Sequence, residues 1–282
     1  MTTLVWHDGA LHGADTPLLS ALDRGVTVGD GIFETCAVVD GTPFALTRHL
    51  DRLARSAAGM GLPVPDEGVV RGAVGEVVAA LGRVDGRLRI TWTAGPGPMG
   101  SARGDGGPTL LVTASPAPPV TVTGAPPARV VVVPWVRNER SPLVGIKSTS
   151  YGENVLALAH ARERGGTEAI LANSRGELCE GAASNVFVES GGVLRTPPLS
   201  SGCLAGVTRE LVLEWARAEG IPVSEETLPL SALHDAEHVA ITSSLRGVLP
   251  VGAVDGRDLA PGPLATAMSE VFSRRRAGDL DP

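Results

Sequence analysis

The sequence is poor in cysteine, in aromatic residues and in positive charge, and each shortage argues against a class of protein. Its three cysteines, Cys36, Cys179 and Cys203, are widely spaced and form no CxxC pair. Neither a zinc site nor a disulfide framework is therefore expected. The formal net charge is −7, so the chain has no basic footprint for nucleic acid or for an anionic membrane. Aromatic residues make up 3% of the chain, with a single tyrosine.

Long apolar runs are missing as well. No run of about 18 apolar residues occurs, so no helix is expected to cross a bilayer. The first residues, MTTLVWHDGALHG, contain neither the basic nor the apolar region of a signal peptide. We therefore expect a reducing, cytoplasmic location. What is present is a hydrophobic fraction of 43% in 282 residues, which suffices for one large or two medium domains.

Proline gathers in the stretch SPAPPVTVTGAPP at residues 115–127. Because proline cannot donate a ladder hydrogen bond, this composition predicts an interdomain linker. We place a first domain at 1–115, the linker at 116–127 and a second domain at 128–282. A long surface loop within one domain is the alternative.

The first domain alternates strands and helices in an antiparallel α+β pattern. Strands are predicted at 3–9, 87–94 and 109–115, and a hairpin turns at Asp40-Gly41. A helix is predicted to begin at Thr47, which can cap it, and to end at Gly59 and Gly61. A second helix follows Asp66.

The second domain reads as a larger mixed domain. Strands are predicted at 128–136, 166–173, 183–190, 221–226 and 237–244, and helices at 153–164 and 207–220. The strand at 183–190 runs into a Gly191-Gly192 turn.

Lys147 and Glu180 are the residues that suggest chemistry. Lys147 follows the uncharged run Val144-Gly145-Ile146. An amine in apolar surroundings loses its proton more readily and can then bond to an aldehyde, although a lone lysine is usually a surface residue. Glu180 could protonate a ring nitrogen at the other end of such a cofactor.

These residues belong to five motifs that occur in order between about residues 20 and 251 and resemble the fold-type IV pyridoxal-phosphate (PLP) enzymes. A strand predicted at 23–35 resembles the signature D-R-G-x-x-x-G-D-G-x-F-E-T, and residues 49–53 resemble H-x-x-R-L. The run ELCEGAASNVF matches E-G-x-x-S-N-x-F at Glu180, Gly181, Ser184, Asn185 and Phe187. The resemblance implies an α+β / α/β, two-domain fold like that of D-amino acid aminotransferases, with a small N-terminal α+β domain and a larger C-terminal mixed domain. It also implies a homodimer with the site between the domains.

The resemblance further implies roles for single residues. Lys147 would be catalytic and carry PLP, and Glu180 would face the ring nitrogen. Phosphate binding falls to Arg52, to Val207 and Thr208 at a helix start, and to Ser243 and Ser244. Arg52 has the alternative of a solvated helix face, beside Arg48 and Arg55. Thr35 and Tyr151 are candidate substrate contacts.

The reaction is the least determined part. The Arg-Gly pair and following histidine of D-amino acid aminotransferases are replaced by Ala94-Gly95 with no histidine after it, and the low aromatic content does not favour branched-chain substrates. The loops resemble aminodeoxychorismate lyases, which release pyruvate and form 4-aminobenzoate. Such a substrate carries two carboxylates, for which Arg103 and Arg246 are the candidates; Arg103 could equally be a solvated loop residue. The alternatives are a class IV aminotransferase for branched-chain or other amino acids, including one that serves secondary metabolism, and a PLP-binding regulator without catalysis.

Overall fold

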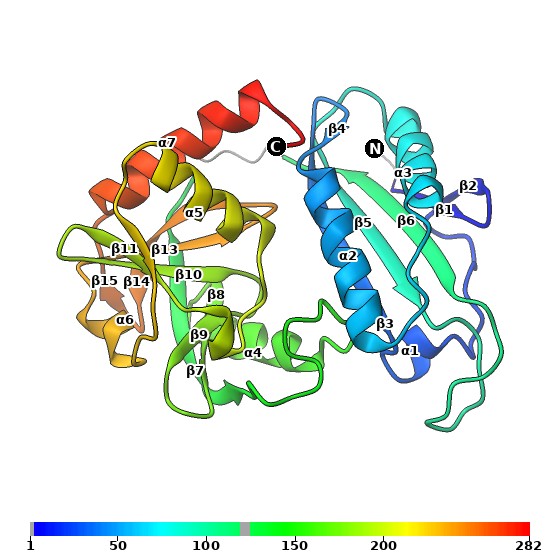
Figure 1. Ribbon diagram of the computed structural model, residues 1–282, viewed down its shortest axis with the longest axis horizontal. Helices are drawn as coiled ribbons and strands as arrows, with labels where there is room; N and C mark the ends of the chain where they lie inside the picture. The colour runs from blue at the N-terminus through cyan, green and yellow to red at the C-terminus, as the bar shows by residue number, and fades with distance from the viewer. Residues whose placement is uncertain (1–2, 119–124) are drawn as a thin grey trace. The chain divides into compact units, whose positions relative to one another are not determined.

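The computed structural model describes residues 3–118 and 125–282, and the chain forms two compact units (Figure 1). Unit 1 comprises Met1–Pro119, Ile146–Tyr151 and Asp279–Pro282; unit 2 comprises Val120–Gly145 and Gly152–Gly278. Unit 1 is therefore built from three separate stretches of sequence. The predicted linker contains residues 119–124, which lie outside the described part of the chain, so its limits and those of the two domains stay predictions.

Unit 1 contains an antiparallel sheet in the order β2-β1-β6-β5-β3-β4. Its strands are β1 (Leu4–His7), β2 (Ala10–Gly13), β3 (Gly31–Val39), β4 (Thr42–Pro43), β5 (Gly86–Thr93) and β6 (Thr109–Pro116). Alternation decides which face is buried: Leu88 and Ile90 of β5 and Ile32 and Cys36 of β3 point into one core. The helices α2 (Leu46–Met60) and α3 (Glu67–Leu81) cover that face through their apolar stripes.

Several local predictions for unit 1 are confirmed. Asp40 and Gly41 both have left-handed φ angles, 44° and 79°, as the tight turn between β3 and β4 requires. Gly61 ends α2 with a φ of 66°. The Asp66 side chain accepts a hydrogen bond from Val69 N–H and so caps α3.

Two local predictions are wrong. Helix α2 begins at Leu46, and its preceding residue, Ala45, is left-handed and makes no side-chain cap. Thr47 is instead itself a donor, because its N–H and hydroxyl both bind the Asp281 carboxylate, at 2.8 and 2.6 Å. The segment 23–35 is not one strand, since α1 (Arg24–Thr27) forms first and β3 starts only at Gly31.

Unit 2 contains a mixed, curled sheet in the order β12-β11-β10-β13-β14-β7-β8-β9, with β15 paired to β14. Neighbouring strands run parallel at β11–β12, β14–β7 and β7–β8. The strands are β7 (Ala128–Arg137), β8 (Glu168–Asn173), β9 (Leu178–Gly181), β10 (Asn185–Ser190), β11 (Val193–Thr196), β12 (Val223–Glu225), β13 (His238–Ser243), β14 (Gly247–Val254) and β15 (Arg257–Asp258). Gly191 and Gly192 form the predicted turn after β10, with φ angles of 56° and 71°.

Helices pack against this sheet in two groups. Helix α4 (Gly152–Glu163) covers β7 and β8 through Ala157 and Ala161. Helix α5 (Val207–Ala218) packs on α7 (Pro263–Gly278), where the rings of Trp215 and Phe272 are 5.3 Å apart. The short helices η1 (Leu199–Ser201) and α6 (Ser231–Asp235) complete the unit. The sequence patterns predict α4 and α5 but not α6 or α7.

Candidate functional site

Lys147 lies in unit 1, in a short segment that is hydrogen-bonded to the start of β3. Phe33 N–H donates to the Lys147 carbonyl at 2.9 Å, and Thr149 N–H donates to the Gly31 carbonyl at 2.8 Å. Lys147 N–H also donates to the hydroxyl of Ser56 on α2, at 3.3 Å. The backbone of this lysine is therefore fixed on two sides within the unit.

The Lys147 side chain is half-buried beside aromatic rings. Its Nζ lies 4.5 Å from the centre of the Phe33 ring and 5.9 Å from that of Tyr151. The two rings meet edge to face, with centres 5.3 Å apart. Aromatic faces exclude water while still tolerating a cation, so the amine is in the partly apolar setting that imine-forming lysines need.

Sequence reasoning missed Arg89 of β5. Its Cζ lies 3.8 Å from the centre of the same Phe33 ring, and burial lowers its pKa. Arg89 is also the residue directly opposite Thr35 in the β3–β5 ladder. In the sequence Arg89 looks like Arg87, two residues earlier on the same face of the strand, and only the structure shows that Arg89 is half-buried while Arg87 is exposed. Arg89 is thus distinguished from Arg87 by its burial and by its contact with Phe33, and both features appear only in the three-dimensional structure.

Arg52 is 4% exposed and forms a bidentate pair with Glu34 of β3. Its Nε and one terminal nitrogen donate to the two Glu34 oxygens at 2.8 and 2.6 Å, and His49 Nδ1 lies 2.6 Å from Glu34. Burial alone would raise the pKa of Glu34, but Arg52 and His49 together lower it to about 2. Burial lowers the pKa of His49, while the neighbouring Glu34 carboxylate acts to raise it. These contacts orient Arg52; its binding of phosphate stays a prediction.

The signature at residues 23–35 has a structural basis in unit 1. Asp23 caps α1 by accepting from Gly25 N–H at 2.8 Å, and its other oxygen accepts from the Thr93 hydroxyl at 3.0 Å. A Cβ on Gly25 would lie 2.3 Å from the Thr93 side chain, so only glycine fits. Gly29 has a φ of 68°, and a Cβ there would meet the hydroxyl of Ser150 at 2.5 Å. The signature thus brings the chain close to the segment that carries Lys147.

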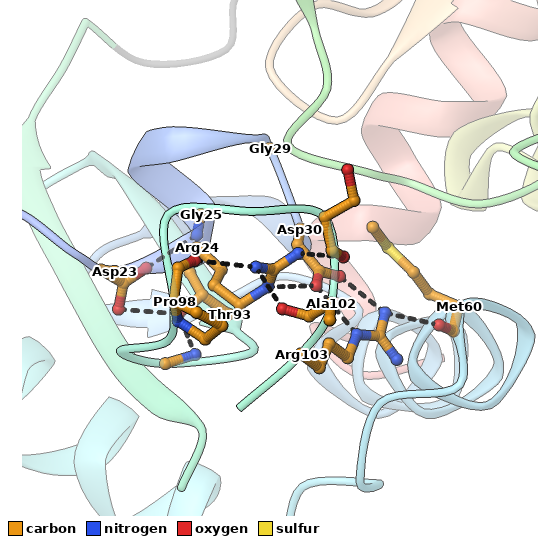
Figure 2. A network of polar contacts seen from close by, with 12 residues as sticks. Asp23, Arg24, Gly25, Gly29, Asp30, Met60, Thr93, Pro98, Ala102 and Arg103 are labelled. Carbon is orange, nitrogen blue, oxygen red and sulfur yellow. Dashed lines mark hydrogen bonds and ion pairs between the residues drawn. The ribbon is translucent and has the colours of Figure 1, made fainter. Parts of the chain in front are cut away.

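Arg24 is the buried centre of a network that includes Arg103 (Figure 2). Its guanidinium donates to Asp30 at 3.0 Å and to the loop carbonyls of Pro98, Gly100, Ser101 and Ala102 at 2.9–3.4 Å. Asp30 also binds Arg103, with contacts of 2.8 and 2.6 Å. Arg24, Asp30 and Arg103 therefore form one network of ion pairs.

The contacts of Arg103 do not favour its predicted role as a substrate ligand. Beyond Asp30, its guanidinium donates to the carbonyls of Gly61 and Met60 at 2.7 and 2.9 Å. Its two terminal nitrogens and its Nε are thus all engaged within unit 1, which indicates that Arg103 fixes its own loop. Substrate binding by Arg103 stays a prediction without support from these contacts.

Glu180 lies in unit 2, on β9, and is 8% exposed. One carboxylate oxygen accepts from Arg137 Nε at 3.2 Å, and the other accepts from Leu204 N–H at 2.9 Å. Arg137 is itself held by Glu153 and Asn154 of α4, at 3.4 Å each. An arginine and a backbone amide favour the charged form of the carboxylate, which is the form that can bind a protonated ring nitrogen.

The start of α5 lies beside the same motif. Gly206 precedes the helix, and a Cβ on it would lie 2.0 Å from the side-chain oxygen of Asn185. Asn185 in turn donates to the Leu204 carbonyl at 2.9 Å. Val207 and Thr208 are buried in the first turn, where backbone N–H groups can bind an anion. Their phosphate role stays a prediction.

Ser243 ends β13, and Ser244 follows it in the turn to β14. Arg246, in the same turn, donates to the Ser243 carbonyl and hydroxyl oxygen, at 3.2 Å each, and binds the carboxylate of Glu168. Arg246 is therefore engaged by groups of unit 2, and its predicted role at a substrate carboxylate is not favoured. The phosphate roles of Ser243 and Ser244 stay predictions.

The described part of the chain contains neither a metal-binding cluster nor a membrane-spanning helix. Over 3–118 and 125–282, no cluster of three or more His, Cys, Asp or Glu side chains could hold a metal ion. Over the same residues, no helix is long and apolar enough to cross a membrane.

The fold agrees with the comparisons to known proteins. Residues 31–254 match the family described as amino-transferase class IV. The chain is 36% identical over 245 residues, 85% of this chain and 83% of the other, to a Methanocaldococcus jannaschii protein named "Putative branched-chain-amino-acid aminotransferase". It is 31% identical over 296 residues, 96% of this chain and 98% of the other, to a Mycobacterium tuberculosis bifunctional aminodeoxychorismate lyase / D-amino acid transaminase.

Among solved structures, the branched-chain aminotransferase of Thermoproteus uzoniensis with norvaline superposes with a TM-score of 0.91 at 30% identity, covering 99% of this chain and 96% of that one. The small antiparallel sheet and the larger mixed sheet are those of a fold-type IV enzyme, as predicted. The chain belongs to the class IV aminotransferases.

PLP is the cofactor of this family, and the residues present fit it. When bound, PLP supplies an electron sink for the substrate carbon. The chain offers a half-buried lysine amine beside two rings, a carboxylate held in its charged form by Arg137, and hydroxyl and amide donors suited to a phosphate.

Proposed function

We propose that the chain is a PLP-dependent aminotransferase that exchanges the amino group between an amino acid with a small or branched apolar side chain and a 2-oxo acid. The observation that carries the proposal is that Arg103 and Arg246 are already bound within the chain. Both are engaged by carboxylates of the chain itself, Asp30 and Glu168. These two arginines are the candidates for the two carboxylates of a lyase substrate, so their contacts with Asp30 and Glu168 do not support the lyase.

The proposal includes roles for the predicted residues. Lys147 would hold the cofactor through its aldehyde and, once displaced by the substrate amine, would move protons at the substrate carbon as general acid and base. Glu180 binds the ring nitrogen, and its contact with Arg137 supports its charged form. The phosphate is bound by Arg52, Val207, Thr208, Ser243 and Ser244.

Unit 1 supports a substrate with one carboxylate. Arg89 and Lys147 both contact the Phe33 ring, so a guanidinium and the reactive amine share one aromatic neighbour. We propose that Arg89 binds the carboxylate of the amino acid, with Thr35 opposite it. The rings of Phe33 and Tyr151 then suit an apolar side chain. The names of the M. jannaschii relative and the T. uzoniensis structure are consistent with a branched-chain substrate.

The test is an assay with purified, PLP-loaded protein. L-leucine, L-valine and D-alanine are each incubated with 2-oxoglutarate, and the new oxo acid is measured. We expect the highest turnover with the branched-chain substrates. A protein that binds PLP but exchanges no amino group with any of these would contradict the proposal.

The lyase is the second candidate, because the M. tuberculosis bifunctional relative matches nearly the whole chain. Its assay is release of 4-aminobenzoate from aminodeoxychorismate without an added oxo acid. Release there, together with silence in the amino acid assays, would establish the lyase in place of the aminotransferase.

Arg89 can be tested against a matched neighbour. Arg89→Gln should raise the KM for the amino acid about tenfold to a hundredfold, since a hydrogen bond to a charged group contributes about 1.5–3 kcal/mol. Arg87→Gln, on the same face of β5 but exposed, should leave KM unchanged. Equal effects of the two substitutions would remove Arg89 from the substrate site.

We also propose a homodimer as the active form. Val26 of α1 is 62% exposed in unit 1, and Val155 and Leu156 of α4 are 62% and 63% exposed in unit 2. Each unit thus exposes large apolar side chains that a second copy could cover. Light scattering of the active protein should give twice the mass of one chain, and a fully active monomer would refute the proposal.

A further inference from the structure

One buried carboxylate of unit 2 has no role in the site described so far. Glu168, the first residue of β8, is 1% exposed. One of its oxygens accepts from the N–H groups of Ala169 and Ala183, at 3.1 and 3.3 Å. The other accepts from the Ser184 hydroxyl at 3.1 Å and from the Arg246 guanidinium. Burying a charge is costly unless its partners are well placed, so these donors are held firmly.

The donors come from two different segments. Ala183 and Ser184 lie in the tight connection between β9 and β10, directly after Glu180. That connection leaves no room for a side chain at Gly181, where a Cβ would lie 2.2 Å from the Ser184 hydroxyl. Arg246 lies in the turn between β13 and β14 that carries Ser243 and Ser244. Its guanidinium also donates to the Ala183 carbonyl, at 3.4 Å, so the two segments are joined twice.

Arg246 also determines how the Ser243 hydroxyl can be used. Its Nε donates to the Ser243 oxygen at 3.2 Å. A hydroxyl has one hydrogen to donate and lone pairs to accept. With an accepting position filled by a cation, the hydroxyl hydrogen is left to bind an acceptor, and an anion is the acceptor that this arrangement favours.

We propose that Glu168 and Arg246 are a positioning pair for the phosphate of PLP. Neither contacts the cofactor. Arg246 orients the Ser243 hydroxyl, and Glu168 fixes Arg246 against the connection that follows Glu180. Because phosphate and ring nitrogen are at opposite ends of a stiff molecule, the pair sets the spacing of the two groups that bind them. This proposal rests on the assignment of Ser243 to the phosphate, which belongs to the proposed function.

The test compares PLP with pyridoxal, which lacks the phosphate. Dissociation constants for both are measured with the apo forms of the wild type, Glu168→Gln, Arg246→Gln and the double variant. Each single variant should weaken PLP binding about tenfold and pyridoxal binding less than threefold, and the double variant should be no weaker than either single one. The control is Glu226→Gln, which removes a separate ion pair with Arg195 in the same unit and should change neither constant.

Equal weakening of PLP and pyridoxal would show a general structural effect and overturn the proposal, as would unchanged binding of both. If Glu168→Gln does not fold, Arg246→Lys keeps the charge but loses the forked geometry, and the same ratio of constants decides. The phosphorus NMR signal of bound PLP should also shift in Arg246→Lys; an unchanged signal with an unchanged ratio counts against the pair. Wild-type protein that prefers PLP over pyridoxal but transfers no amino group would refute the proposed function and leave this test intact.

Discussion

The two units fix their functional loops with buried charges of opposite sign. In unit 1 the buried group is a cation, Arg24, and it collects the carbonyls of the loop that follows β5. In unit 2 the buried group is an anion, Glu168, and it collects N–H and hydroxyl donors of the connection between β9 and β10. In each unit a more exposed arginine completes the ion pairing: Arg103 binds Asp30 in unit 1, and Arg246 binds Glu168 in unit 2.

The difference follows from what each loop offers. The loop between β5 and β6 is rich in glycine and proline, so it has few side chains with which to fix itself. Its glycines also allow a close fold: a Cβ on Gly95 would lie 1.8 Å from the Gly107 carbonyl, and one on Gly97 would meet Arg24 at 2.9 Å. Carbonyls turned inward need a donor, and a guanidinium has five N–H groups. The connection after Glu180 turns N–H groups inward and needs an acceptor.

The largest effect is expected from Arg24→Met, which tests whether the cation organises its loop. Asp30 would remain largely buried with one of its two arginines removed, and four carbonyls would lose a donor. We expect a loss of about 3–5 kcal/mol in unfolding free energy, measured by urea denaturation, with faster proteolysis within residues 96–107. Arg83→Ala, which removes an exposed pair with Asp40, should leave the unfolding free energy almost unchanged, because solvent screens such a pair. Similar results for both variants would mean that the contacts of Arg24 contribute no more to stability than an exposed ion pair does.

The sequence predicts the framework of both units but not these charge pairings. Periodicity and turn residues locate β3, β5, α3 and the Asp40-Gly41 turn because those signals are local. Arg103 and Arg246 look like available cations in the sequence because their carboxylate partners are 73 and 78 residues away. The cap of α2 is missed for the same reason, since Asp281 lies 234 residues from Thr47. Motif resemblance singles out Lys147 and Glu180 as candidates, but it carries no information about Arg137, which packing brings to Glu180, or about Arg89, which packing brings to Phe33.

A buried anion in unit 1 sharpens the comparison, because Glu34 has the same charge as Glu168 but is bound by Arg52 and His49. The pKa of Glu34 is lowered from 4.5 to about 2, since Arg52 and His49 more than offset its burial. A lowered folded-state pKa means that the charge stabilises the protein above pH 4.5 and that this contribution is lost as the pH falls toward 2. The shift corresponds to on the order of 3 kcal/mol. The lowered pKa of His49 adds a smaller loss that begins below about pH 6.5.

Glu34→Gln should therefore be less stable than the wild type at pH 7, and the difference should shrink as the pH falls below 4.5 and nearly vanish at about pH 2. The measurement is urea unfolding at a series of pH values, with Glu76→Gln, on α3 of the same unit, as the matched control. A stability difference that stays constant from pH 7 to pH 3 would show that the Glu34 charge is not what the unit depends on.

The smallest expected effect tests how much burial matters for a carboxylate that binds several donors. Asp281 is an anion that gathers donors in unit 1, as Glu168 does in unit 2, but its contacts with Thr47 are exposed. Solvent screens such contacts, so Asp281→Ala should cost only about 1 kcal/mol, the usual effect of losing a helix cap. Asp281→Asn keeps an acceptor oxygen and should recover most of that loss. Thr47→Val removes the hydroxyl but keeps the N–H that Asp281 binds, so it should cost less than Asp281→Ala. If Thr47→Val were the more damaging of the two, Thr47 rather than Asp281 would be the residue that stabilises the start of α2, and an exposed carboxylate would not gather donors as a buried one does.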